Sequence, residues 1–138
     1  MKVFIDANIF LRFILQDDEE KAGHCSKLLK KVDGGEVQAA TSMLVLNEIL
    51  WVLEGLNVGR EDIAKRIKAI AMSEVEVLGR ANSSAVLESL GYYGKLDVDF
   101  IDALNACIAR ESGIRDIITY DEHFKKIEFV NKIEPQEL

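Results

Sequence analysis

The stretch Lys2-Val3-Phe4-Ile5-Asp6-Ala7-Asn8 decides the fold class. It opens with a short apolar run of strand-forming side chains and then reaches an aspartate. Such a run predicts a buried strand of the kind found in parallel sheets. Ligand sites in these sheets lie at the carboxyl ends of the strands, where Asp6 stands. Asp6 could equally cap a helix that begins near Asn8, so this position alone leaves both roles open.

Strands and helices alternate along the rest of the chain. Further strands are expected at 37–41, 75–78 and 116–119, with a short fifth strand beginning at 129–130. Helices are expected at 8–15, 17–33, 43–54, 60–72, 82–94 and 99–112. This alternation predicts an α/β fold, a three-layer α/β/α sandwich around a central, mostly parallel sheet of four to five strands.

Length and composition indicate one domain covering residues 1–138. The chain has 138 residues, of which 49% are hydrophobic, enough for one core. A single proline, Pro135, and the lack of repeats or biased segments give no sign of a linker. Cys25 and Cys107 lie far apart in expected helices, a spacing typical of neither a disulfide framework nor a metal-binding pair. We expect both cysteines to be buried in a reducing compartment.

No segment is expected to enter a membrane. Asp6 interrupts the only apolar run near the N-terminus, which therefore does not resemble a secretion signal. The most apolar stretch, 43–53, contains Asn47 and Glu48 and is too short to span a bilayer. These features predict a cytoplasmic protein.

The formal net charge of −7 argues, taken alone, against a nucleic-acid partner. The argument weakens if several of the acids bind metal ions. Setting aside four such acids leaves a formal charge of −3 on the remainder, and bound divalent ions reverse the local field. Net charge therefore excludes neither RNA nor DNA.

Three more carboxylates stand out beside Asp6. Asp121 directly follows the strand expected at 116–119, so it shares the sheet edge with Asp6, although turn formation is an alternative role. Glu48 falls among the apolar neighbours of its helix, where a glutamate needs a cation or a donor unless it lies at the boundary of that face. Asp102 lies in the first turn of its helix, where an acid also stabilises the helix dipole.

Carboxylates gathered in one place repel one another unless a cation lies between them. Oxygen-only ligands favour Mg²⁺ or Mn²⁺, which retain waters and meet substrate phosphates. The chemistry predicted for Asp6, Glu48, Asp102 and Asp121 is therefore metal-assisted phosphodiester hydrolysis. Asp99 is expected to cap its helix instead of binding metal.

Other catalytic chemistries lack their residues. His24 and His123 are the only histidines, and both are expected at the surface, so neither a zinc site nor a serine-type triad is indicated. Glycine-rich phosphate loops are absent, and Asp6-Ala7-Asn8 lacks the second aspartate of haloacid-dehalogenase-like phosphatases. Some basic residues could track RNA phosphates, although most are expected to be solvated: Arg12, Lys27, Lys30, Lys31, Arg60, Lys65, Arg66 and Lys68.

Four short motifs in order resemble the PIN domain family over essentially the whole chain, and VapC-type toxins most closely. They are Val3-Phe4-Ile5-Asp6-Ala7-Asn8, the helix-start segment Ser42 to Glu48, Asp99-Phe100-Ile101-Asp102-Ala103-Leu104, and Thr119-Tyr120-Asp121 followed by Phe124. The resemblance implies that Asp6, Glu48, Asp102 and Asp121 bind Mg²⁺ or Mn²⁺ and that Asn8 supports their geometry. Asn105 stands where the family usually has a small or aliphatic residue.

The resemblance also implies an endoribonuclease with RNA as substrate, a homodimer, and often a small antitoxin partner. Surplus apolar residues on two expected helices, Leu28, Leu29 and the stretch 44–51, point to the same homodimer. Two rival functions remain open: an RNA-processing or decay nuclease without an antitoxin, and a catalytically silent interaction module. A receiver-like signalling domain is disfavoured because no lysine follows the strand at 116–119.

Overall fold

The computed structural model describes all residues 1–138, which form five strands, six α-helices and two short 3₁₀ helices. In chain order these are β1 (Lys2–Ile5), α1 (Ala7–Leu15), α2 (Glu19–Asp33), β2 (Gln38–Ser42), α3 (Met43–Gly55), α4 (Arg60–Ala71), β3 (Glu76–Leu78), α5 (Ser83–Leu96), α6 (Phe100–Glu111), β4 (Asp116–Ile118), η1 (Glu122–Lys126), β5 (Asn131–Ile133) and η2 (Pro135–Glu137).

The five strands form one sheet in the order β3-β2-β1-β4-β5, and every neighbouring pair is parallel. β1 lies at the centre, where Val3, Phe4 and Ile5 are completely buried. This burial on both faces explains why the first strand is a continuous apolar run. The chain moves from β1 outward to β2 and β3, and then returns to place β4 on the other side of β1.

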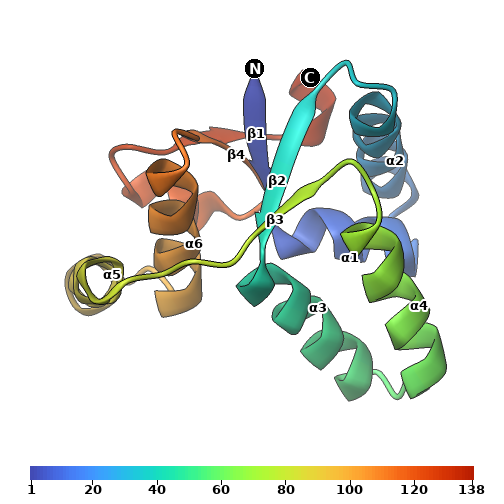
Figure 1. The fold of residues 1–138 in the computed structure, drawn as a ribbon, viewed down its shortest axis with the longest axis horizontal. Coiled ribbons are helices and arrows are strands. Elements are labelled where there is room, and N and C mark those ends of the chain that lie inside the picture. The colour runs from blue at the N-terminus through green and yellow to red at the C-terminus, as the bar shows by residue number, and fades with distance from the viewer.

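The helices cover the sheet in two groups. Helices α1 to α4 lie on one side of the sheet and α5 and α6 on the other, as Figure 1 shows. Because parallel crossovers are right-handed, the reversal of strand order at β1 sends the later helices to the opposite face. The prediction of a three-layer α/β/α sandwich is therefore confirmed, with a sheet that is wholly parallel.

Local signals place most helix ends as expected. The Ser42 hydroxyl accepts a bond from the Val45 amide at 3.1 Å and caps α3. Gly34 follows the last residue of α2, and Gly35 has a φ of +79°, a conformation that glycine adopts without steric cost. No helix of the structure is long and apolar enough to cross a membrane.

Two expectations are wrong in detail. The fifth strand is Asn131–Ile133 and does not include residues 129–130, because Phe129 and Val130 instead pack against the core from the preceding turn. Leu28, expected to contribute surplus surface for a dimer, is only 1% exposed and belongs to the core beneath α2. The expectation that Cys25 and Cys107 are buried and unpaired is confirmed.

Candidate active site

The two strand-end aspartates face the point at which the strand order reverses. Asp6 follows β1 and Asp121 follows β4, and these strands are neighbours in the sheet. The Asp6 amide still donates to the Ile118 carbonyl of β4 at 3.1 Å, so the ladder extends to the first acid. Connections leave β1 and β4 toward opposite faces, which opens the crevice where parallel sheets bind ligands.

The carboxylate of Asp6 is held by three donors. One oxygen, Oδ1, accepts from the Ala7 amide at 2.8 Å and so caps α1. The other, Oδ2, accepts from the Thr119 hydroxyl at 2.8 Å and from the Asn8 side-chain amide at 3.0 Å. Capping and site formation are therefore compatible roles. Burial raises the pKa of Asp6 to about 6, the bonds from Thr119 and Ala7 oppose that rise, and the charges of Glu48 and Asp121 add to it.

Asn8 and Thr119 join the ends of β1 and β4. The Asn8 amide donates to the Thr119 hydroxyl oxygen at 2.9 Å, and the Asn8 carbonyl oxygen accepts from the Tyr120 amide at 3.2 Å. The Thr119 hydroxyl also accepts from the Asp121 amide at 3.0 Å. Through the Thr119 hydroxyl, these bonds connect the backbone amide of Asp121 to the side chain of Asp6. Thr119 and Asp6 are 113 positions apart in the chain.

Asp102 projects from the first turn of α6 and is 8% exposed. No protein N–H donates to its carboxylate, unlike that of Asp6. Burial, followed by the negative charges of Asp6, Asp121 and Glu48, raises the pKa of Asp102 to about 8. All four predicted acids thus interact at this edge of the sheet.

Glu48 reaches the same edge from α3 and is half-buried. Its pKa is raised by burial first and then by the charges of Asp99 and Asp121. The Ser42 hydroxyl that caps α3 donates to the buried Asn105 side chain on α6 at 2.5 Å. Asn105 therefore fixes the helix that carries Glu48 against the helix that carries Asp102.

Asp99 differs from its expected role. It occupies the N-cap position of α6, but its side chain makes no capping hydrogen bond. The carboxylate is exposed, and its charge acts on Glu48 more strongly than that of Asp121 does. The helix start at Asp99 was predictable, whereas the direction of its side chain depends on the neighbouring α3.

Sequence patterns missed three supporting side chains. Thr119 was noted only as part of a motif, Asn105 only as a departure from the family, and His123 only as a surface residue. The structure shows His123 exposed but bonded to Asp121. The polar character of Thr119 beside a buried strand was the one signal that could have revealed it, since a buried hydroxyl requires partners.

The donor set fits a hard divalent cation by its chemistry. Four carboxylates supply only oxygen ligands, and the pKa values of Asp6 and Asp102 are raised first by burial and then by neighbouring negative charges, both of which a bound cation would offset. In this structure no three side chains among His, Cys, Asp and Glu meet closely enough to ligate a single ion.

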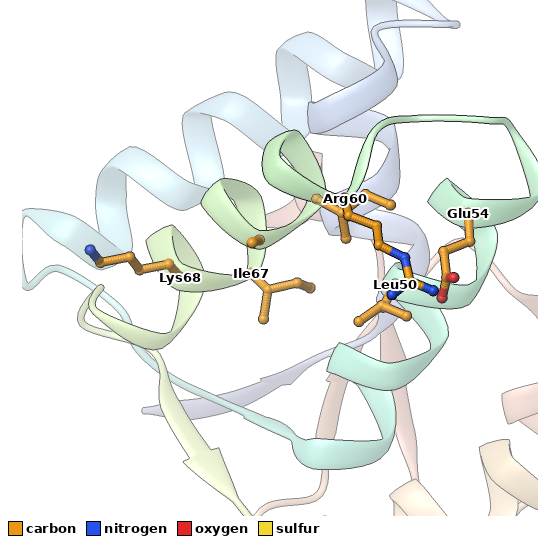
Figure 2. Close-up of a pocket in the computed structure, with 7 residues that line it drawn as sticks. Leu50, Glu54, Arg60, Ile67 and Lys68 are labelled. Carbon is orange, nitrogen blue, oxygen red and sulfur yellow. The ribbon is translucent and has the colours of Figure 1, made fainter.

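A separate apolar pocket lies between α3 and α4. Its volume is about 560 Å³, and it is lined by Leu50, Glu54, Arg60, Ile63, Ala64, Ile67 and Lys68. Figure 2 shows Arg60 extending from α4 toward Glu54 of α3, with Leu50 beside them. None of the four acids lines this pocket, so its chemistry is distinct from that of the acidic crevice.

A parallel α/β/α sandwich with carboxylates at its switch point defines a class of α/β domains whose ligand site lies at the carboxyl edge of the sheet. The family model for the PIN domain matches residues 3–130, and the chain belongs to this family. It is 25% identical over 126 residues to a VapC ribonuclease of Aquifex aeolicus, covering 91% of each protein.

Two solved structures share the fold. VapC20 of Mycobacterium tuberculosis, described as a sarcin-ricin loop cleaving toxin, superposes with a TM-score of 0.73 at 21% identity, covering 93% of this chain and 96% of that one. VapBC-1 of nontypeable Haemophilus influenzae gives a TM-score of 0.71 at 17% identity and covers 98% of each chain.

Proposed function

We propose that this protein is a Mg²⁺- or Mn²⁺-dependent endoribonuclease that hydrolyses RNA phosphodiesters as the toxin of a toxin–antitoxin pair. The observation that carries the proposal is the position of Asp6 and Asp121 at the carboxyl ends of the neighbouring parallel strands β1 and β4, where the charges of Asp6, Glu48 and Asp121 act on Asp102. A nuclease of the PIN family requires such a group of acids, and the similarity to the Aquifex VapC ribonuclease supports RNA as the substrate.

In this proposal Asp6, Glu48, Asp102 and Asp121 hold the metal. When bound, a divalent cation polarises the phosphoryl oxygen and lowers the pKa of a coordinated water. Asp6 is oriented in advance by Thr119, Asn8 and the Ala7 amide. Asp102 has a pKa of about 8, so near neutral pH it must release a proton before it can act as an anionic ligand.

The proposed partners follow from the related structures. Several neighbours were solved as toxin–antitoxin assemblies, including one from Klebsiella pneumoniae, with a TM-score of 0.63 at 16% identity. We extend this to a small antitoxin for the present chain and to a cytoplasmic location. A short neighbouring gene encoding a DNA-binding N-terminus would support the toxin role, whereas its absence would favour RNA processing or decay.

We also propose a homodimer that covers exposed apolar side chains of α3. Met43 and Trp51 are 56% and 73% exposed, and Leu50 lies between them in sequence. Covering such side chains favours self-association. Light scattering of the purified chain should give twice the monomer mass; a strict monomer at high concentration would contradict this part of the proposal.

The decisive experiment incubates the pure protein with structured RNAs, with and without Mn²⁺, beside Asp6→Asn. Cleavage is expected only for the parent with metal. Asp6→Asn keeps the shape of the side chain and removes a charged ligand, so it controls for contaminating nucleases. Metal-independent cleavage, or equal cleavage by the variant, would refute the proposed chemistry.

A further inference from the structure

His123 makes a contact with the acidic crevice that the proposed function does not use. The imidazole Nδ1 lies 2.9 Å from Oδ1 of Asp121. The backbone amide of His123 donates to the same oxygen, also at 2.9 Å. One residue therefore supplies two bonds to a single oxygen of a proposed metal ligand.

The chemistry of this contact fixes the role of each atom. An ionised carboxylate only accepts hydrogen bonds, so Nδ1 must carry the proton that it shares with Oδ1. Both nitrogen donors from His123 lie on Oδ1, and no N–H group donates to the second oxygen, Oδ2. Two donors on Oδ1 thus set the rotation of the carboxylate and leave Oδ2 facing the other acids.

Asp121 depends on this contact more than Asp6 depends on any one of its own. Both oxygens of Asp6 are bound, by donors from three residues, and its side chain is buried. The Asp121 side chain is 28% exposed, and His123 supplies the side-chain nitrogen that lies against its Oδ1. Without the imidazole, the backbone amide alone would hold Asp121 Oδ1, and the carboxylate could turn toward solvent.

We propose that His123 is a positioning residue of the metal site. Its Nδ1–H holds Oδ1 of Asp121 so that Oδ2 is presented to the divalent cation. Partners of this kind orient metal ligands, and their loss typically weakens metal binding by roughly 10–100-fold. The inference rests on the proposed function, because it takes Asp121 to be a metal ligand.

The test measures Mn²⁺ binding without RNA, by the loss of the electron paramagnetic resonance signal of free Mn²⁺. His123→Ala should weaken binding by about 10-fold or more. His123→Asn should restore most of the affinity, because the asparagine amide can occupy the place of Nδ1. His123→Gln should not restore it, because its amide corresponds to Nε2. His24→Ala serves as the matched control, since His24 lies 3.8 Å from Glu20 on α2 and contacts none of the four acids.

A double-substitution cycle separates positioning from a general structural effect. If His123 acts through Asp121, then His123→Ala should cause no further loss of Mn²⁺ affinity in an Asp121→Ala background. The metal-free variants should retain the circular dichroism spectrum of the parent.

Three results would each overturn the inference. His123→Ala could bind Mn²⁺ as the parent does, or His123→Asn and His123→Gln could bind it equally well. Alternatively, His123→Ala could weaken Mn²⁺ binding in the Asp121→Ala background as much as it does in the parent. A parent protein that binds no Mn²⁺ would instead refute the proposed function, and this inference with it. The two failures are therefore distinguishable.

Discussion

The acidic crevice, meaning the surroundings of Asp6, Glu48, Asp102 and Asp121 at the carboxyl edge of the sheet, and the α3–α4 pocket are built in opposite ways. In the crevice, Thr119, Asn8 and Asp6 bond to one another across the ends of β1 and β4. In the pocket, apolar side chains such as Ile67 line a hollow between two helices that follow each other in the chain. The crevice is fixed by long-range polar contacts, whereas the pocket leaves apolar surface uncovered.

This difference teaches where a substitution should act. A change in the crevice alters hydrogen bonds and charges that hold the proposed metal ligands and contribute to stability. A change at the open side of the pocket removes little that the folded chain needs. Substitutions of charged and hydrogen-bonding groups in the crevice should therefore have larger effects than a substitution in the pocket.

The largest effect is expected for Asp6→Asn. The substitution removes the charge of a proposed metal ligand while leaving its shape. RNA cleavage should fall by about 100-fold or more, because loss of a bound cation costs several kcal/mol of transition-state stabilisation. Single-turnover cleavage in Mn²⁺ measures it. Cleavage within a few-fold of the parent would remove Asp6 from the metal site.

Asp102→Asn should separate metal binding from metal-free stability. Above pH 8, where Asp102 is ionised, the variant relieves repulsion among the acids, so without metal it should melt at the same temperature as the parent or higher. Mn²⁺ at about 100 times its dissociation constant should stabilise the parent by roughly 2.7 kcal/mol and the variant by less. Thermal melts with and without Mn²⁺ provide both numbers. A metal-free variant that melts lower with an unchanged response to Mn²⁺ would leave Asp102 only its effect on the helix dipole.

Removing the hydroxyl of Thr119 tests the hydrogen bonds that join Asp6, Asn8 and Thr119. Thr119→Val keeps the shape but deletes the donor to Asp6 and the acceptor for Asn8 and Asp121. Unsatisfied buried partners should lower the free energy of unfolding by roughly 1–3 kcal/mol. Urea denaturation measures the loss. An unchanged midpoint would show that the hydrogen bonds of the Thr119 hydroxyl do not contribute to stability.

The stability of the metal-free protein should fall as pH rises from about 6 to about 8. Asp102 has its pKa raised from 3.8 to about 8 on folding, so in this range the folded state binds more protons than the unfolded state. Unfolding then becomes easier with each increase in pH, and the loss is complete above the folded pKa. Asp6, whose pKa is raised from 3.8 to about 6, adds the same fall in stability between these two pH values. Melting temperatures across this range, beside Asp102→Asn, measure the effect. If the melting temperature fell equally steeply with pH in the parent and in Asp102→Asn, the pH dependence would belong to other titratable groups.

The smallest effect is expected in the pocket. Ala64 is exposed on α4 and lines the hollow, and glutamine is a good helix former. Ala64→Gln should change the free energy of unfolding by no more than about 0.5 kcal/mol and leave Mn²⁺ affinity unchanged. Calorimetry of the same sample measures both quantities. A large change in either would mean that the pocket and the crevice are coupled.

Local patterns predicted most of the fold. The apolar run before Asp6, the cap at Ser42 and the glycines after α2 each act over a few residues, so their consequences are visible in sequence. The predicted start of the fifth strand was two residues too early. The position of an edge strand such as Asn131–Ile133 depends on its partner β4 more than on its own composition. The PIN family assignment followed from the order of four motifs and is confirmed by the family model.

The sequence by itself determined which acids are candidates, since strand ends and an apolar helix face mark them without coordinates. Only the tertiary structure decided how they are held. Thr119 binds Asp6, Asn105 binds Ser42, and His123 binds Asp121 through atoms whose positions depend on the packing of strands and helices. The physical reason is range: propensity and capping act between near neighbours in the chain, whereas hydrogen bonds and charge repulsion in a crevice act between residues that only folding brings together.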